Sequence, residues 1–400
     1  MRFKKFGLLP QLILGILMGM LLGSIGTVFH IEKNILFVGM VRLFTTFSSL
    51  FSTFLSFIIP LLILSFVTIG LADLGKKANK LFGITLVIAY CSTIAAGFSA
   101  FLAGKAILPG MIKEIAAKTL NEKTFDVLFT ITADPVCSVM TALILAFILG
   151  LGIANTETRS LYNCIKEIQE IIKLVLGKII IPLIPIHIAG LFCKIAAEGS
   201  LFPTIKMFIR LYIMILVFQW FYIALQFGVA SLVCHKNQFP KIKNTIPAYF
   251  TALGTQSSAS TIPVSLESAE KNEVTKEISE FVIPLGATIH LAGDTICLVI
   301  GSMGILLANG IAPSLSIYLP FIFMLGVTMI AAPGVPGGGV MSALGLITSL
   351  LGFSDSMQQL IISLHLSQDS FGTACNISGD QSIALMIDWI DQRFGTASLN

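Results

Sequence analysis

The chain contains long runs of residues that include no Asp, Glu, Lys or Arg. Such runs cover residues 6–31, 43–72, 81–104, 135–156 and 211–235. Each run reaches the ~20 residues that an α-helix needs to cross the hydrocarbon core of a bilayer. The pattern predicts an all-α membrane protein, because a water-soluble fold could not bury so much apolar surface.

Six simple membrane spans are predicted before the C-terminal third of the chain. They are residues 8–30, 36–72, 81–108, 135–154, 174–197 and 205–234. A polar loop is expected at residues 109–134, and a charged amphipathic linker at residues 157–178. Pro60, inside the second span, predicts a kink that neighbouring helices tolerate.

The composition supports this class. Of the 400 residues, 55% are hydrophobic and 12% are charged, whereas a soluble chain averages roughly 25% charged residues. The net charge of +4 is small, so we expect no nucleic-acid partner. Seven cysteines without a CxxC pair indicate neither a disulfide framework nor a zinc cluster. The first uncharged run is too long for a signal-peptide core, so we expect a retained helix.

The distribution of Lys and Arg predicts the orientation in the membrane. If the N-terminus is cytoplasmic, the cytoplasmic ends of the spans carry Arg2, Lys4, Lys5, Lys76, Lys77, Lys80, Arg159, Lys166, Lys236, Lys241 and Lys243. The opposite side then carries Lys33, Lys105, Lys113, Lys118, Lys123 and Lys194. The positive-inside rule therefore favours a cytoplasmic N-terminus in a multi-pass protein of the cell (inner) membrane.

Two uncharged segments in the C-terminal third are interrupted by breaks. The first has a hydroxyl-rich cluster from Thr251 to Thr261 that Pro263 closes, and the second has glycines and prolines at residues 331–339. Irregular backbone at membrane depth is tolerated only where it is buried in protein or lines a wet cavity. Paired interruptions of this kind indicate the binding site of a transporter. The alternative is that the turns only allow close helix packing.

Polar groups also interrupt two other apolar segments, residues 284–294 and 367–380. At 100° per residue, Asp369, Thr373, Asn376 and Asp380 fall on one face of a helix. Ionisable groups within the membrane are candidates for functional sites. No Lys or Arg lies between residues 276 and 393. The partners of these carboxylates must therefore be other polar groups, ions or a ligand.

These segments resemble motifs of the dicarboxylate/amino acid:cation symporter family, in order and over nearly the whole chain. Residues 255–263 are similar to the serine-rich tip of the first hairpin in that family, and residues 284–293 to the break in its seventh helix. Residues 332–339 resemble the tip of its second hairpin, and residues 368–380 resemble the polar stripe of its eighth helix.

The resemblance implies eight transmembrane helices plus two re-entrant helical hairpins, assembled as a homotrimer with cytoplasmic N- and C-termini. Residues 1–80 would form scaffold helices one and two, and residues 81–108 would form helix three of a mobile transport (elevator) domain. Residues 109–200 would form a loop and scaffold helices four and five. Residues 201–400 would form the rest of the transport domain: helix six, hairpin one, helix seven, hairpin two and helix eight.

The resemblance also implies a binding site for an amino acid. Asp369 would hold the ammonium group and Asn376 the carboxylate, with Thr373 lining the site. Backbone groups at the hairpin tips would close over the substrate. The implied substrate-binding residues are Ser257, Ser258, Asp294, Val335, Gly339, Asp369, Gly372, Thr373 and Asn376.

Sodium is the implied coupling ion, and no cofactor is expected. One sodium site would use the Asp380 side chain with backbone carbonyls of Gly286, His290 and Asn376. A second would use carbonyls around Thr288 and at Met329, Ile330 and Ala332.

Departures from the family pattern bear on specificity. Gly372 stands where transporters of acidic substrates carry an arginine, and Gln256 replaces an arginine that some members carry. Ala292 stands where the family has an aspartate, and Ile94 where it has a serine, whose side chains help to form a further sodium site. We therefore expect a neutral substrate, by analogy with the sodium:serine/threonine symporters. Glutamate, aspartate or C4-dicarboxylates are the alternative substrates. A cationic amino acid is a further alternative, because Asp294 could accept its side chain.

His290 replaces an asparagine of the family pattern and is a candidate for proton coupling, because histidine takes up a proton in the physiological pH range. Asp294, four residues later, would be its counter-charge. The alternative is a neutral histidine that donates to a backbone carbonyl freed by the break at Gly293. An intramembrane enzyme is not expected, because residues 377–380 lack the first glycine of a Gly-x-Gly-Asp motif and no His-Glu-x-x-His motif occurs. A channel would not need two occluding hairpins.

Overall fold

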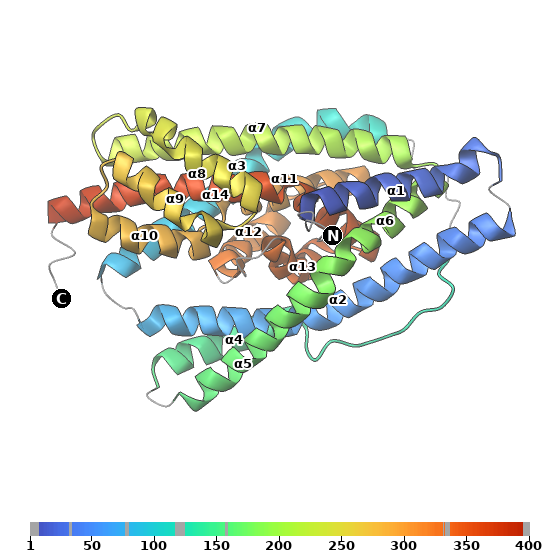
Figure 1. The fold of residues 1–400 in the computed structure, drawn as a ribbon, viewed down its shortest axis with the longest axis horizontal. Helices are drawn as coiled ribbons and strands as arrows, with labels where there is room; N and C mark the ends of the chain where they lie inside the picture. Colours follow the sequence, from blue (N-terminus) through green and yellow to red (C-terminus); the bar gives the residue numbers. More distant parts are fainter. Residues whose placement is uncertain are drawn as a thin grey trace, which may run out of the picture.

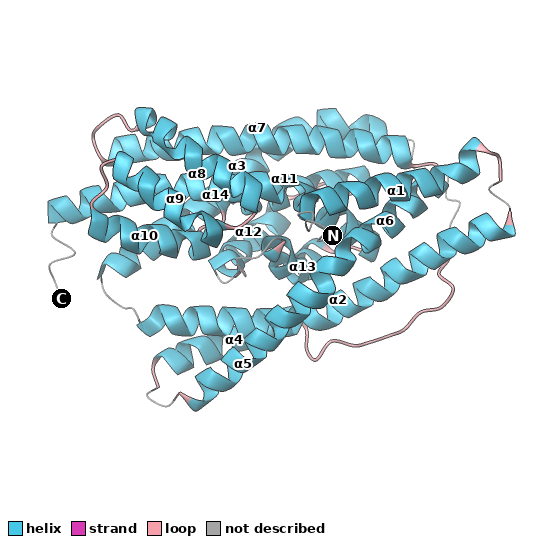
Figure 2. Ribbon diagram, in the orientation of Figure 1, coloured by secondary structure: helices cyan, strands magenta, loops and turns pink. Residues whose placement is uncertain are grey.

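The computed structural model describes residues 8–31, 34–76, 80–116, 125–156, 159–330, 332 and 337–394. These residues form helices and connecting loops, with no strand among them (Figure 2). The α-helices are α1 Leu8–Val28, α2 Ile35–Lys76, α3 Lys80–Ala116, α4 Val139–Ala154, α5 Ser160–Val175, α6 Ile181–Ala197, α7 Leu201–Val233, α8 Ile242–Thr255, α9 Ser258–Lys271, α10 Lys276–Ile289, α11 Ala292–Ala308, α12 Leu315–Ile330, α13 Gly338–Leu351 and α14 Asp355–Phe394.

Several helical stretches are long and apolar enough to cross a bilayer. Among the described residues these are Ile35–Ala72, Leu81–Ile112, Ser160–Ala197, Leu201–Val233 and Lys276–Ala308. The all-helical class predicted from the uncharged runs is confirmed, and the stretches are those expected of a membrane protein. Part of the orientation prediction lies outside the described residues, because it rests on Arg2, Lys4, Lys5, Lys33, Lys77, Lys118 and Lys123.

The predicted polar loop at residues 109–134 is wrong at its beginning. Helix α3 continues through Pro109 and ends at Ala116. Its apolar stripe also continues, because Leu108 and Ile112 are both buried at helical spacing. Residues 117–124 lie outside the described residues, and 125–138 form no helix.

The predicted amphipathic linker is a helix. In α5, Ile165, Gln169 and Ile172 are buried on one face. The π-helical turn η1, Leu176–Ile180, joins α5 to α6 without an intervening loop. The stretch from Ser160 to Ala197 is therefore helical throughout.

Helix α1 packs closely along α6, beside which it lies in Figure 1. Three of its glycines, Gly15, Gly19 and Gly23, are spaced four residues apart, so they share one face. A Cβ atom added at Gly15, Gly19 or Gly23 would lie 2.4, 2.2 or 2.2 Å from a backbone carbonyl oxygen of α6. Only glycine fits at these contacts, which bring the two backbones together as small residues do in membrane helix pairs.

The C-terminal helix α14, red in Figure 1, is surrounded by other helices. It contacts α7, α8, α10 and α11, and almost every residue from Ile361 to Asp388 is buried. Helices α8 and α9 pack against each other as a helical hairpin, and so do α12 and α13. Helices α1, α2, α4, α5 and α6 make a second set of mutual contacts, in which α2 touches α4, α5 and α6.

Candidate functional site

Three interruptions of the helices place polar groups against the same region of α14. Between α8 and α9, Gln256 has a left-handed backbone (φ 52°), and the Ser257 side chain caps α9 by accepting from the amide of Ser260. The side-chain amide of Gln256 donates from Nε2 to Ser370 Oγ on α14, at 2.9 Å. Between α10 and α11, His290 is extended. Before α13, Gly337 is left-handed (φ 76°).

A small cavity of about 30 Å³ lies where these interruptions meet α14. It is lined by Gln256, Ser258, Ala287, Leu291, Asp294, Ala332, Gly339, Asp369, Thr373 and Asn376. This volume is comparable to that of one water molecule, so the cavity as described is too small for an amino acid. The structure thus brings together most of the predicted substrate-binding residues, whose roles remain predictions.

Three of the predicted residues, Ser257, Val335 and Gly372, are not among the described residues that line the cavity. Val335 lies outside the described residues. Gly372 does not line the cavity, but a Cβ atom added there would lie 3.8 Å from Asp294 Oδ2 and meet ordinary van der Waals contact. A longer side chain at position 372 would therefore begin beside Asp294.

Asp369 is buried and bonded to the second hairpin. Its Oδ2 atom accepts a hydrogen bond from the backbone amide of Gly337, at 2.9 Å. Gly337 directly precedes α13, where free amides and the helix dipole favour an anion. The carboxylate is therefore in contact with the tip of the hairpin formed by α12 and α13.

Asp294, in the first turn of α11, has partners on both carboxylate oxygens. His365 Nε2 lies 2.9 Å from Oδ1, and the Asn376 amide donates to Oδ2 at 2.6 Å. Asn376 Oδ1 in turn accepts from the amide of Gly293, at 2.7 Å. The broken helix and α14 are therefore joined by a buried polar network.

His365 is a site residue that the sequence reasoning missed. The signal was present, because a residue four positions before Asp369 falls on the same face of α14. The polar stripe therefore begins one turn earlier than predicted.

The backbones of α11 and α14 approach closely at this network. A Cβ atom on Gly293 would lie 2.4 Å from the carbonyl oxygen of Gly372. A Cβ atom on Gly339 would lie 2.6 Å from Asp294 Oδ1. Glycine at these positions lets the two broken segments reach the stripe on α14.

The second buried carboxylate on the stripe, Asp380, pairs with His290. Asp380 Oδ1 lies 2.9 Å from His290 Nδ1, and both side chains are fully buried. The other ring nitrogen, Nε2, lies 3.0 Å from Ser92 Oγ. The structure corrects the expectation that Asp294 is the counter-charge of His290. Because the helix stops at Ile289 and restarts at Ala292, residues 290 and 294 do not share a helical face.

Asp380 has one carboxylate oxygen to offer a small hard cation. Its Oδ2 atom is buried and has no hydrogen-bond partner among the described residues. Gly286 is adjacent, since a Cβ atom there would lie 2.7 Å from Asp380 Oδ1. Carboxylate oxygens are among the donors that hard cations take. The sodium roles of Gly286, His290, Asn376 and Asp380 stay predictions.

The second predicted sodium site is described only in part. Thr288 is exposed and its hydroxyl donates to the carbonyl of Leu285, at 2.7 Å. Met329 is buried, Ile330 is half-buried, and Ala332 lines the small cavity. Residues 331 and 333–336, which would complete the loop, lie outside the described residues.

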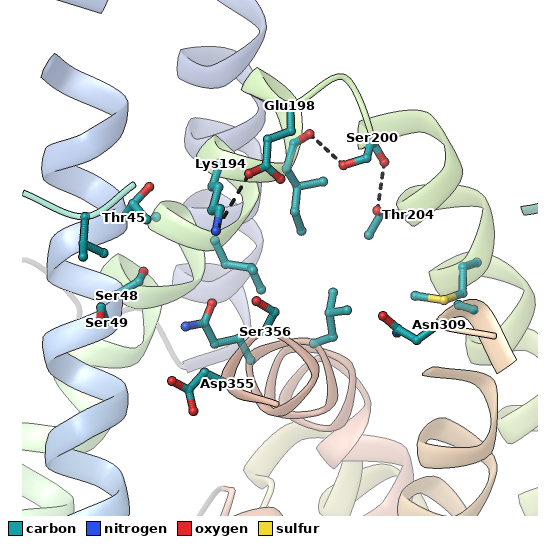
Figure 3. Close-up of a pocket in the computed structure, with 18 residues that line it drawn as sticks. Thr45, Ser48, Ser49, Lys194, Glu198, Ser200, Thr204, Asn309, Asp355 and Ser356 are labelled. Atoms are coloured by element: carbon teal, nitrogen blue, oxygen red, sulfur yellow. Dashed lines mark hydrogen bonds and ion pairs between the residues drawn. The ribbon is translucent and has the colours of Figure 1, made fainter. Parts of the chain in front are cut away.

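A larger cavity of about 360 Å³ lies away from the stripe (Figure 3). Residues of α2 and α6, among them Ser48 and Lys194, line one side, and residues of α11 and α14, such as Asp355, line the other. Its hydroxyl groups are mostly bonded to backbone, as Ser200 and Thr204 show in Figure 3. The cavity therefore separates two sets of helices and presents no convergent set of unpaired polar groups.

Buried carboxylates beside interrupted apolar helices are the features expected at the binding site of a membrane transporter. The sequence profile of the sodium:dicarboxylate symporter family matches residues 8–390. The chain belongs to this family, which confirms the resemblance found in the motifs.

Curated relatives include serine/threonine transporters named SstT. One from Acinetobacter baylyi is 26% identical over 371 residues, which cover 88% of this chain and 92% of the relative. Another from Enterococcus faecalis is 23% identical over 413 residues, which cover 98% of this chain and 93% of the relative. The similarity thus extends over nearly the full length of each protein.

Proposed function

We propose that this protein is a secondary active transporter that couples uptake of a neutral α-amino acid to a sodium gradient. The observation that carries the proposal is the small cavity lined by Asp369 and Asn376, where Asp369 also accepts a hydrogen bond from the backbone amide of Gly337. Asp369 binds the substrate ammonium, and Asn376 binds the carboxylate together with backbone groups of Ser257, Ser258 and Gly339. The names of the relatives, serine/threonine transporters, agree with a neutral substrate.

The charge of the cavity supports this substrate class. Asp294 and Asp369 both line it, and its lining holds no Lys or Arg. A substrate with a second carboxylate would be desolvated beside two acidic groups without a basic partner, which is unfavourable by several kcal/mol in order of magnitude. A neutral side chain meets no such penalty.

Sodium coupling is assigned to the region of Asp380. The buried Oδ2 atom without a protein partner and the adjacent Gly286 support it. Because Asn376 lies between Asp369 and Asp380 on one helical stripe, substrate and ion would share a residue. Occupancy of one site would then favour the other, which is what coupling requires.

The proposed movement is that of an elevator in a homotrimer with eight spans and two re-entrant hairpins. The mutual contacts of α1, α2, α4, α5 and α6 support a scaffold, and the helices around α14 support a transport domain. The larger cavity between α2 or α6 and α14 lies where these two sets meet (Figure 3). Both termini are proposed to be cytoplasmic in the cell membrane.

The test is uptake by purified protein in liposomes with an imposed inward sodium gradient. Labelled serine, threonine and alanine should accumulate, and collapse of the gradient should release them. Aspartate and glutamate should compete poorly. The proposal would be wrong if no amino acid bound or accumulated under either a sodium or a proton gradient.

A further inference from the structure

Asp294 is a buried carboxylate, and the side chain of a neutral substrate brings no positive charge to pair with it. In the proposed function the substrate ammonium is taken by Asp369. A neutral amino acid therefore brings no second positive group to Asp294, although that side chain is only 4% exposed. A buried charge is unfavourable unless it is paired and hydrogen-bonded.

His365 supplies the missing partner from within the chain. Its Nε2 lies 2.9 Å from Asp294 Oδ1, and its own side chain is 1% exposed. Ligand atoms of Asp294, His365 and Asp369 all lie within 4.8 Å of one another. The other histidine of this region, His290, is bonded to Asp380 instead. One imidazole therefore lies beside both carboxylates of the cavity.

Among the described residues, the other hydrogen-bond partner of the Asp294 side chain is neutral. The Asn376 amide donates to Oδ2, and it is itself held by the amide of Gly293. Removal of His365 would leave Asp294 with amide partners only. A carboxylate in that state would favour a substrate whose side chain carries a positive charge, because breaking a buried pair leaves an uncompensated charge.

We propose that His365 determines the side-chain specificity of the transporter. By donating to Asp294 it satisfies this carboxylate internally, so that the cavity accepts neutral, hydroxyl-bearing side chains and disfavours cationic ones. His365 acts through Asp294 and is a positioning residue that need not touch the substrate. The inference rests on the proposed function, since it takes Asp369 as the ammonium site.

A matched pair of amino acids provides the probe. L-homoserine and L-2,4-diaminobutyrate have side chains of the same length and differ in a terminal hydroxyl or ammonium group. Competition against labelled serine in wild-type liposomes should rank homoserine first. In His365→Ala the ratio of the two affinities should shift toward diaminobutyrate by at least ~10-fold, because the buried carboxylate of Asp294 has lost its imidazole partner. His365→Gln, which keeps an N–H donor at a similar distance along the side chain, should retain the wild-type ranking.

The double variant His365→Ala/Asp294→Asn separates specificity from folding. With the carboxylate also removed, the preference for diaminobutyrate should disappear, because replacing both partners of a buried bond leaves no uncompensated charge. If His365→Ala does not fold, the double variant against Asp294→Asn still tests the pairing: equal rankings support it, and a cationic preference in the double variant overturns it.

The outcomes distinguish this inference from the proposed function. Wild-type protein that takes up serine, with rankings unchanged in His365→Ala, overturns the role of His365 alone. Wild-type protein that binds no amino acid overturns both. A uniform loss of affinity for both competitors in His365→Ala would mean a structural role only and would also overturn the inference.

Discussion

The carboxylate of Asp369, which lines the small cavity, and the backbone amide of Gly337 are joined by a hydrogen bond of 2.9 Å. The residue proposed to hold the substrate ammonium is therefore also the residue that contacts the second hairpin. A substrate that binds Asp369 changes the environment of this bond. Binding at α14 and the position of the hairpin are thereby linked through one side chain.

Asp369→Asn should weaken substrate binding by about 2–5 kcal/mol, the usual effect of removing one partner from a buried charge pair. The asparagine side chain keeps the shape and can still accept from Gly337, so the fold should persist. Competition binding of serine measures the loss. Asp355→Asn, at the first turn of the same helix, lines the larger cavity and not the small one; it is the matched control and should bind serine as wild type. Equal binding by both variants would remove Asp369 from the site.

Asp380→Asn should raise the sodium concentration needed for half-maximal uptake by ~10-fold or more, because the negative charge of the ligands sets cation affinity. The measurement is serine uptake against external sodium in liposomes. A variant that loses maximal uptake but keeps the wild-type sodium dependence would argue against a cation at Asp380.

His290→Asn tests the prediction that His290 carries a proton. Uptake at fixed sodium, measured over about pH 5.5 to 8, should depend on pH in wild type and lose that dependence in the variant. The asparagine can still donate to Asp380, which controls for the hydrogen bond of 2.9 Å. The same pH profile in both proteins would mean that His290 is a neutral structural donor.

Gly372→Arg alone should not create an aspartate transporter. The new side chain would start 3.8 Å from Asp294 Oδ2, so its guanidinium would pair with that carboxylate. The double variant Gly372→Arg/Asp294→Thr frees the guanidinium and should bind aspartate at least ~10-fold more tightly than either single variant. Competition of aspartate against labelled serine, carried out on all three variants, measures the affinity for aspartate. Tight aspartate binding by Gly372→Arg alone would contradict the expected pairing.

Gly19→Ala should destabilise the protein by about 1–3 kcal/mol through overpacking, since its Cβ would lie 2.2 Å from the carbonyl oxygen of Ala189. Gly39→Ala is the matched control. It also lies inside a helix, and a Cβ atom there has no neighbour within 4 Å, so it should be neutral or stabilising by up to about 1 kcal/mol. Thermal unfolding in detergent compares them. Equal melting temperatures would show that the α1–α6 contact is not as close as described.

Much of the helix order could be predicted from uncharged runs, because lipid requires long apolar segments. The extension of α3 past Pro109 could not, since proline and polar residues favour a loop locally and only packing of Leu108 and Ile112 opposes it. Periodicity placed Asp369, Asn376 and Asp380 on one face, and the structure has them buried on one helix.

The pairing of the carboxylates was beyond sequence reasoning. Spacing along the chain joins His290 to Asp294, whereas the structure joins His290 to Asp380 and Asp294 to His365. Both pairs are formed between segments that are far apart in sequence. They depend on how α11 and α14 come together at Gly293, which a one-dimensional pattern does not contain.

The burial of α14 has a consequence for how the protein is made. Among the described helices, α14 is not one of those apolar enough to cross a bilayer by composition, and aspartates near the centre of a span disfavour insertion by roughly 2.5–3.5 kcal/mol each. In the chain it follows α7, α8, α10 and α11, which are its neighbours in the fold. Its entry into the membrane should therefore depend on these earlier helices being in place to receive its polar stripe, so that the segment with the proposed site inserts after the helices that enclose it.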